Sequence, residues 1–138
     1  MKILTLARDL RRRKARERKG LFVAEGVRTV EELLRSPISV NSALIGPQLR
    51  ESPRGAELLA MLSARGIPIE EVESAEFASA AETASPQGAL AVGVVPLLTL
   101  QQLPATERAR FLVLDAVQDP GNVGTIIRTA AAFGASAT

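Results

Sequence analysis

The 138-residue chain contains neither cysteine nor histidine. These absences exclude a disulfide scaffold, a zinc site of the Cys/His type, a thiol nucleophile and a histidine general base. No metal site is therefore expected, and any chemistry must use carboxylates, cationic side chains, hydroxyls, amides or backbone groups. Tryptophan and tyrosine are also absent, and there are only four phenylalanines. This scarcity disfavours an aromatic platform on which single-stranded nucleic acid could stack.

Long apolar segments are absent as well. The first ten residues include Lys2, Arg8 and Asp9, so no signal peptide is predicted. The uncharged stretch 83–106 contains three prolines and three glutamines, and its apolar core, 89–95, is far shorter than the roughly 20 residues that cross a bilayer. With 46% hydrophobic and 23% charged residues, the chain is expected to be a globular, cytoplasmic protein of at most one domain and a part.

The charge is unevenly distributed. Residues 1–19 carry nine basic and two acidic side chains, a local net charge of +7, whereas residues 20–138 carry a local net charge of −5. Phosphate backbones attract such a cluster by counterion release, so RNA is the predicted partner. A solvated helix or tail without a partner is the alternative, and a membrane is disfavoured because no long amphipathic helix is predicted. The cluster, called the basic arm below, consists of Arg8, Arg11, Arg12, Arg13, Lys14, Arg16, Arg18 and Lys19.

Strand and helix patterns alternate along residues 21–95, which predicts an α/β layer with a mostly parallel sheet. Pro68 favours an edge position for its strand, and the continuous apolar run 89–95 favours burial on both faces. Strands are predicted at 21–24, 40–45, 67–72 and 89–95, helices at 5–19, 27–35, 56–65 and 74–81, and a polar loop at 48–54.

Local signals set several of these boundaries. Thr5 and Ser74 are predicted to cap the first and last of the four helices, and Gly20 is predicted to end the first. Glu31 and Arg35, four residues apart, are expected to form an ion pair on their helix.

A second unit begins after the proline-containing linker at 96–109. Residues 111–114 are predicted to form a fifth strand, 115–121 a loop, and 123–133 a helix. A single strand and helix cannot complete a parallel sheet. We therefore expect the chain to be part of a longer protein and residues 111–138 to be poorly anchored by themselves.

The loop before the last helix carries the candidate chemistry. Gly121 and Gly124 permit close approach of a ligand, and free N–H groups at the helix start would attract an anion. Helical phase places Arg128 opposite the apolar face, where its guanidinium could bind a phosphate at two points. Alternatively, Arg128 is merely solvated, and Asp119 or Asn122 merely caps the helix. The predicted apolar face consists of Val123, Ile126, Ile127, Ala130 and Phe133.

Together these residues resemble a known family. The sequence DPGNVG at 119–124, followed by IRTA at 127–130 and FGA at 133–135, resembles the first motif of the SpoU (TrmH) family of RNA 2′-O-ribose methyltransferases. Upstream, FVAEGVRTV at 22–30 and SPQGALAV at 85–92 resemble the substrate-binding domain of that family, whose fold is similar to ribosomal protein L30e.

The resemblance implies methyl transfer from S-adenosylmethionine to a ribose 2′-hydroxyl, with ribosomal RNA as the expected substrate. It implies an L30e-like RNA-binding domain at 1–95, a linker at 96–109, and the start of a knotted α/β (SPOUT) methyltransferase domain at 110–138, active as a homodimer. By the same resemblance Arg128 is catalytic, Asn122 helps to build the site, Glu25 is structural or contacts RNA, and Arg28 joins the basic arm in binding RNA.

The second and third motifs of that family are expected after Thr138. The residues that bind the cofactor are therefore unassigned, and this chain alone is expected to be inactive. One alternative is a non-enzymatic RNA-binding module of the L30e type, which explains the basic arm but not the motif around Arg128. Another is a phosphate-binding metabolic domain, which would need a lysine or an acidic ribose contact in its glycine loop.

Overall fold

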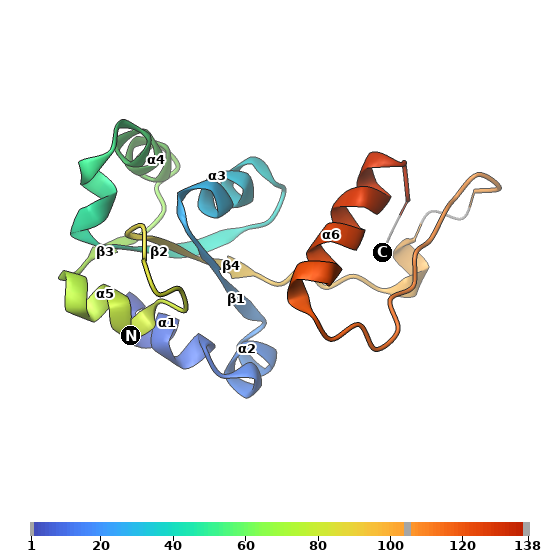
Figure 1. The fold of residues 1–138 in the computed structure, drawn as a ribbon, viewed down its shortest axis with the longest axis horizontal. Helices are drawn as coiled ribbons and strands as arrows, with labels where there is room; N and C mark the ends of the chain where they lie inside the picture. The colour runs from blue at the N-terminus through green and yellow to red at the C-terminus, as the bar shows by residue number, and fades with distance from the viewer. Residues whose placement is uncertain (1, 104–105, 137–138) are drawn as a thin grey trace. The chain divides into compact units, whose positions relative to one another are not determined.

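The computed structural model describes residues 2–103 and 106–136, and the chain divides into two compact units, Met1–Pro96 (unit 1) and Leu97–Thr138 (unit 2). Unit 1 is a four-stranded sheet with helices on both faces (Figure 1). None of the helices in the described ranges is long and apolar enough to cross a membrane. The strands are β1 (Leu21–Glu25), β2 (Val40–Ile45), β3 (Ile69–Glu71) and β4 (Ala89–Val94).

The strand order is β1-β4-β2-β3, and β4 runs antiparallel to both of its neighbours. Only β2 and β3 are parallel, so the prediction of a mostly parallel sheet is wrong. The reason lies in the connection between β3 and β4. Glu71, at the end of β3, and Ala89, at the start of β4, both align with Ile45. The chain therefore re-enters the sheet from the end at which it left, which reverses the direction of β4.

The predicted burial and edge positions in this sheet are confirmed. β4 lies in the interior of the sheet, and its residues from Ala89 to Val92 are at most 2% exposed. β3 is an edge strand, as Pro68 indicated, although it is shorter than predicted.

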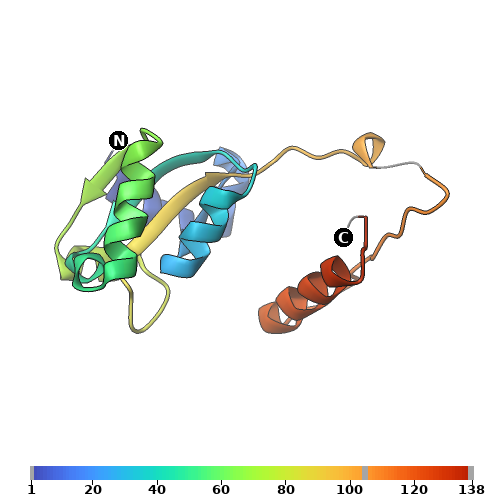
Figure 2. The same cartoon turned by 90° about the horizontal axis from the view of Figure 1, so that it is seen from above.

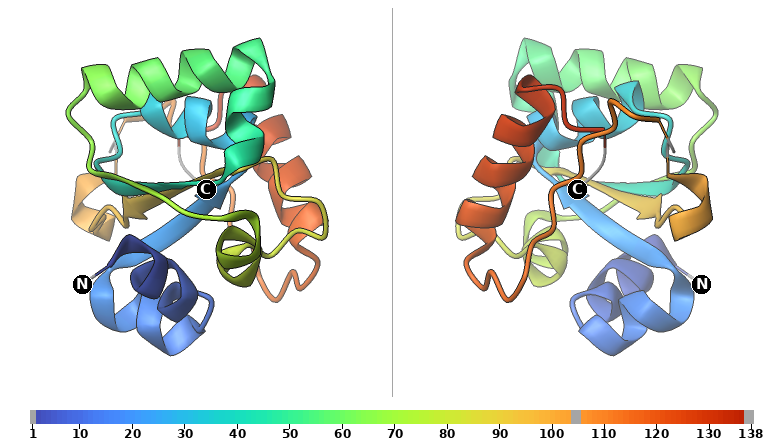
Figure 3. Two further views of the ribbon diagram at one scale, coloured as in Figure 1. Left: turned by 90° about the vertical axis from the view of Figure 1, so that its left-hand side faces the viewer. Right: turned by 90° about the vertical axis from the view of Figure 1, so that its right-hand side faces the viewer.

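Two hydrophobic clusters lie on opposite faces of the sheet, because successive side chains of a strand alternate between its faces. Figure 3 shows the helices that cover these two faces. Helices α3 (Val27–Arg35) and α4 (Pro53–Ala64) cover the face that presents the small residues Ala43 and Ala91. Helices α1 (Ile3–Leu10) and α5 (Ser74–Ala80) cover the face that presents the larger Leu44 and Leu90.

The basic arm is not the single helix predicted. It forms α1 and a second helix, α2 (Arg13–Lys19), because Arg12 is extended and interrupts the helical path. The first helix begins before Thr5, at Ile3, where the carboxylate of Glu70 accepts the N–H of Leu4 at 3.1 Å. Gly20 ends the second helix in the left-handed conformation, φ 62°, as predicted.

The predicted polar loop at 48–54 is wrong. Pro47–Glu51 is a 3₁₀ turn that buries Leu49, and α4 already begins at Pro53. Ser52 caps this helix by accepting the N–H of Gly55 at 3.1 Å, so Ser52-Pro53 is a start signal that the prediction missed. At α5, the cap is formed by Glu73, in a reciprocal arrangement with Glu76, rather than by Ser74.

The predicted pair of Glu31 with Arg35 is also wrong, because Arg35 binds Glu32 instead. Glu31 is buried, and both of its carboxylate oxygens accept hydrogen bonds from Arg54 of α4, at 2.9 and 2.5 Å. The hydrogen bonds from Arg54 hold the pKa of Glu31 below its ordinary value. This bidentate pair ties α3 to α4.

The pair predicts a pH-dependent stability. Since the folded-state pKa of Glu31 is lowered, its carboxylate stabilises the fold above about pH 4.5, its ordinary pKa, and this stabilisation is lost as the pH falls through the lowered value. Glu31→Gln should lower the Tm at pH 7, and the difference from wild type should vanish under strongly acidic conditions. Glu32→Gln, whose side chain is 74% exposed, should change the Tm little. A pH-independent difference at Glu31 would contradict this account.

The described part of unit 2 contains one long helix, α6 (Pro120–Ala132), and a short 3₁₀ turn at Leu100–Gln102 (Figure 2). The predicted strand at 111–114 is wrong, because only an isolated bridge forms at Phe111. The helix begins earlier than predicted, because Asp119 caps it and Pro120 occupies its first position. None of the described residues of unit 2 is buried, and Phe133 is 79% exposed.

Hydrogen exchange tests how well unit 2 is ordered in the 138-residue chain. The amides of residues 111–114 should exchange at nearly the intrinsic rate, because no strand pairs with them among the described residues. Those of β4, paired on both sides, should be strongly protected and serve as the internal reference. Strong protection of residues 111–114 in a monomer would show that the segment is anchored after all.

Candidate functional site

Arg128 lies on the exposed surface of α6. Its Nη2 donates a hydrogen bond to Oγ1 of Thr125 at 3.2 Å, and no carboxylate among the described residues forms an ion pair with it. The guanidinium lies beside Gly124, since a Cβ at that residue would be 3.1 Å from Nη1. The cation is thus exposed and available to an anion, as helical phase predicted.

Asp119 and Asn122 are both exposed at the start of α6 but have different roles. Oδ1 of Asp119 accepts the N–H of Asn122 at 2.7 Å, so Asp119 is the helix cap. Asp119 accepts the Asn122 N–H, so this group is no longer free, and the attraction of an anion by the remaining N–H groups at the helix start stays a prediction. Among the described residues, none forms a hydrogen bond with the Asn122 side chain. Its predicted role in the site therefore rests on the resemblance of the motif alone.

An apolar hollow of about 470 Å³ lies in unit 2, between α6 and the segment at Phe111. Its walls include Ile126, Ala130 and Phe133 of the predicted apolar face, and its polar groups come from Arg110 and two threonines. These groups do not suit the charged and hydrogen-bonding parts of S-adenosylmethionine, which would need several convergent polar partners. No described residue is therefore assigned to the methyl donor.

Several cations of the basic arm have structural contacts. Arg8 donates to Oγ of Ser79 at 2.7 Å, and Arg11 donates to the Ser79 carbonyl at 3.2 Å. Both bonds tie α1 to α5. Arg16 donates to the carbonyls of Leu10 and Arg11 at 2.9 and 2.8 Å, which satisfies the end of α1.

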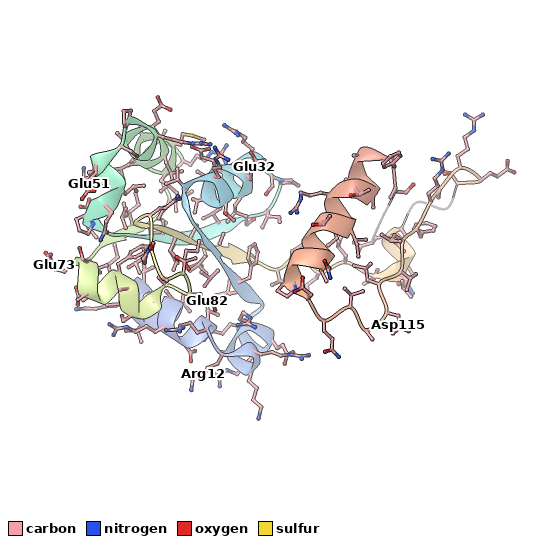
Figure 4. The ribbon with its side chains drawn as sticks, viewed as in Figure 1. Arg12, Glu32, Glu51, Glu73, Glu82 and Asp115 are labelled. Carbon is pink, nitrogen blue, oxygen red and sulfur yellow. The ribbon has the colours of Figure 1, made fainter. Side chains whose placement is uncertain are left out.

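Asp9 forms ion pairs with three cations of the basic arm. Its carboxylate lies against Arg12 and within 4 Å of Arg18 and Lys19. The hydrogen bond from Arg12 is the main reason that the pKa of Asp9 is lowered. Even so, Arg12 is 75% exposed and stands at the outer side of the arm (Figure 4).

The remaining cations leave the surface of the arm strongly positive. Arg13 pairs with Glu17 at 2.6 Å but is 83% exposed, Arg18 is 72% exposed, and Lys14 is exposed. A ligand that binds the arm would therefore meet Arg12 and the exposed cations of α2 first.

Arg28 is not part of this surface, because α3 lies on the other side of the sheet from α1. It lines a groove of about 740 Å³ together with Gln48, Arg54 and Gln87, none of which the sequence singled out as a ligand contact. Gln87 also accepts the N–H of Val27 at 3.0 Å and so caps α3. The cations assigned to RNA thus form two separate surfaces of unit 1.

Glu25 has a structural role. Its carboxylate accepts the N–H of Glu82 at 2.7 Å and hydrogen bonds from the backbone and side chain of Thr83. These bonds hold the loop before β4 against the end of β1. Figure 4 shows Glu82 on this loop.

Comparison with known proteins agrees with this geometry. Residues 3–91 match the MRM3-like substrate binding domain, and residues 109–138 match the SpoU rRNA Methylase family. An α/β unit that matches a substrate-binding domain is thus followed by a segment that matches the SpoU methylases. The chain belongs to the SpoU (TrmH) family.

Three relatives illustrate the match. The chain is 37% identical to the 23S rRNA (guanosine(2553)-2′-O)-methyltransferase RlmP of Bacillus subtilis, over 94% of this chain and 47% of RlmP. It is 33% identical to the uncharacterized tRNA/rRNA methyltransferase slr1673 of Synechocystis, over 92% of this chain and 45% of that protein. The AdoMet-bound rRNA methyltransferase from Sinorhizobium meliloti superposes with a TM-score of 0.76 at 29% identity, covering 96% and 48% of the two chains. The chain spans about half the length of these relatives.

Proposed function

We propose that this chain forms the RNA-binding part and the first catalytic motif of a methyltransferase that modifies a ribose 2′-hydroxyl of ribosomal RNA. The observation that carries the proposal is Arg128. It stands in the segment that matches the SpoU methylases, and its guanidinium is exposed with no acidic partner among the described residues. A non-enzymatic RNA-binding module would account for the fold and charge of unit 1. It would not account for the segment around Arg128 that matches the SpoU methylases.

The domain assignment follows the sequence expectations. Residues 1–95 bind the RNA substrate, 96–109 connect the two parts, and 110–138 begin the knotted methyltransferase domain. The methyl donor is S-adenosylmethionine, which the structurally similar enzyme of Sinorhizobium meliloti binds. We assign the complete protein to the cytoplasm and expect it to act as a homodimer, as the family resemblance implies.

The chemical role of this chain is to hold the RNA. S-adenosylmethionine supplies an electrophilic methyl group, while the ribose hydroxyl is a weak nucleophile that must be oriented and lose its proton. Arg128 binds the phosphate next to the ribose through two N–H groups, which fixes the sugar. The hydroxyl proton then passes to an oxygen of that phosphate, because the guanidinium is already protonated and has no lone pair to accept it. Asn122, six residues earlier in the first turn of α6, helps to build the same site.

Unit 1 supplies affinity. The exposed cations of the basic arm contact the RNA backbone, with Arg12, Arg13, Lys14 and Arg18 most accessible, and Arg28 adds a contact in its groove on the other side of the sheet. Arg8, Arg11, Arg16 and Lys19 also raise the local potential while they stabilise α1 and α2.

A transfer assay tests the proposal. The complete gene product is incubated with methyl-labelled S-adenosylmethionine and with ribosomal RNA from cells in which the gene is deleted. Label should enter that RNA and should not enter ribosomal RNA from cells that retain the gene, because the target ribose is already modified there. Equal labelling of the two RNAs, or none, would contradict the proposal.

A further inference from the structure

Thr125 makes two hydrogen bonds that define the direction of its hydroxyl. Oγ1 lies 2.9 Å from the carbonyl oxygen of Gly121, one turn earlier in α6. A carbonyl only accepts, so the single hydroxyl hydrogen of Thr125 is directed at Gly121. The lone pairs of Oγ1 are then free to accept a hydrogen bond from Nη2 of Arg128, 3.2 Å away. The Arg128 guanidinium therefore donates to the Thr125 hydroxyl, which in turn donates to the Gly121 carbonyl.

Gly124 lies next to Nη1 of the guanidinium, whereas Thr125 binds its Nη2. A Cβ at this residue would lie 3.1 Å from Nη1 and 3.8 Å from Cζ of Arg128, so a side chain here would shift the guanidinium outward by a few tenths of an ångström. Side chains on a helix lean toward its N-terminus. Arg128 therefore lies back along α6 over residues 124 and 125, toward the glycine-containing start of the helix.

We propose that Thr125 is a positioning residue that, together with Gly124, holds the Arg128 guanidinium in the orientation required to grip the sugar–phosphate unit of the substrate. A free arginine side chain samples many rotamers, and each unproductive one reduces the rate. A hydroxyl that is itself fixed by Gly121 removes part of this freedom before RNA binds. This role rests on the proposed function of Arg128.

The test compares Thr125→Val with Thr125→Ser in the complete protein. Valine keeps the β-branched shape but has no hydroxyl, whereas serine keeps the hydroxyl. Thr125→Val should lower kcat by about tenfold to a hundredfold, because a displacement of the order of 1 Å can have this effect. The KM for RNA should change little, and Thr125→Ser should retain most of the activity.

A double-mutant cycle separates positioning from a contribution to helix stability. In an Arg128→Ala background, Thr125→Val should cause no further loss, because its partner is already gone. An added loss of equal size in that background, or an unchanged kcat for Thr125→Val alone, would overturn the inference. If Arg128→Ala itself kept the wild-type rate, the proposed function would fail first, which distinguishes the two failures.

Gly124→Ala provides an independent variant in case Thr125→Val does not fold. Alanine favours the helix, so the Tm should stay the same or rise. The added methyl group should nevertheless displace the guanidinium and lower kcat. An unchanged kcat in a variant that folds normally would contradict the proposed position of the Arg128 guanidinium beside Gly124.

Discussion

Arg128→Ala is expected to lower the kcat of RNA methylation by about 10²–10³-fold, the loss typical of removing one group that binds developing or adjacent charge in an active site. The guanidinium is exposed, has no acidic partner among the described residues, and lies in the motif matched to the SpoU methylases. Its loss removes both the two-point grip on the phosphate and the fixed position of the ribose. The measurement is single-turnover methylation of ribosomal RNA by the complete protein.

The matched control is Arg108→Ala, which removes an exposed arginine of the same unit outside the motif. Its rate should equal that of wild type. RNA affinity should change little in Arg128→Ala, because one phosphate contact among many contributes a small part of the binding free energy. A large drop in affinity with an unchanged rate in the bound complex would assign Arg128 to binding and not to catalysis.

Charge reversal in the basic arm is expected to weaken RNA binding strongly. The double variant Arg13→Glu and Arg18→Glu should reduce affinity by about tenfold to a hundredfold near 0.1 M salt, and the slope of log affinity against log salt should fall by at least about 1.5. Both side chains are highly exposed, at 83% and 72%, so neither substitution disturbs a buried contact. Filter binding or fluorescence anisotropy across a salt series measures both quantities.

The control for this variant is the double charge reversal of Arg35 and Arg50. These arginines are 61% and 57% exposed in the same unit, and each has an acidic neighbour, like the pair in the arm. The two double variants change net charge equally, so a general electrostatic effect would weaken binding by both. If the two variants bound RNA equally well, the arm would not be the RNA-binding surface.

Much of unit 1 could be predicted because its elements carry strong local signals. The apolar run of β4 indicated burial, and Pro68 indicated an edge strand, and both are confirmed. The direction of β4 could not be predicted in this way. Parallel and antiparallel strands have the same local pattern, and only the alignment of Glu71 and Ala89 with Ile45 shows from which end the chain returns.

The sequence predicted the relative positions of candidate site residues that lie on the same helix. Helical phase placed Arg128 and Thr125 on the same face of α6, although the hydrogen bond between them was not anticipated. The structural contacts of the basic arm could not be predicted, because Ser79, which binds Arg8, is 71 residues away in the sequence. The pattern alone could not tell whether Asp119 or Asn122 caps α6, because both residue types are common caps, and the hydrogen bond from the Asn122 N–H assigns the cap to Asp119.

The identity of the methylated atom tests the central claim most directly. Ribosomal RNA labelled by the complete protein and S-adenosylmethionine is digested to nucleosides, which are separated and identified by mass. The account predicts that all label is found in a single 2′-O-methylribonucleoside, and that Arg128→Ala forms this product about 10²–10³-fold more slowly. Label on a nucleobase, or a 2′-O-methyl product formed equally well by Arg128→Ala, would contradict it.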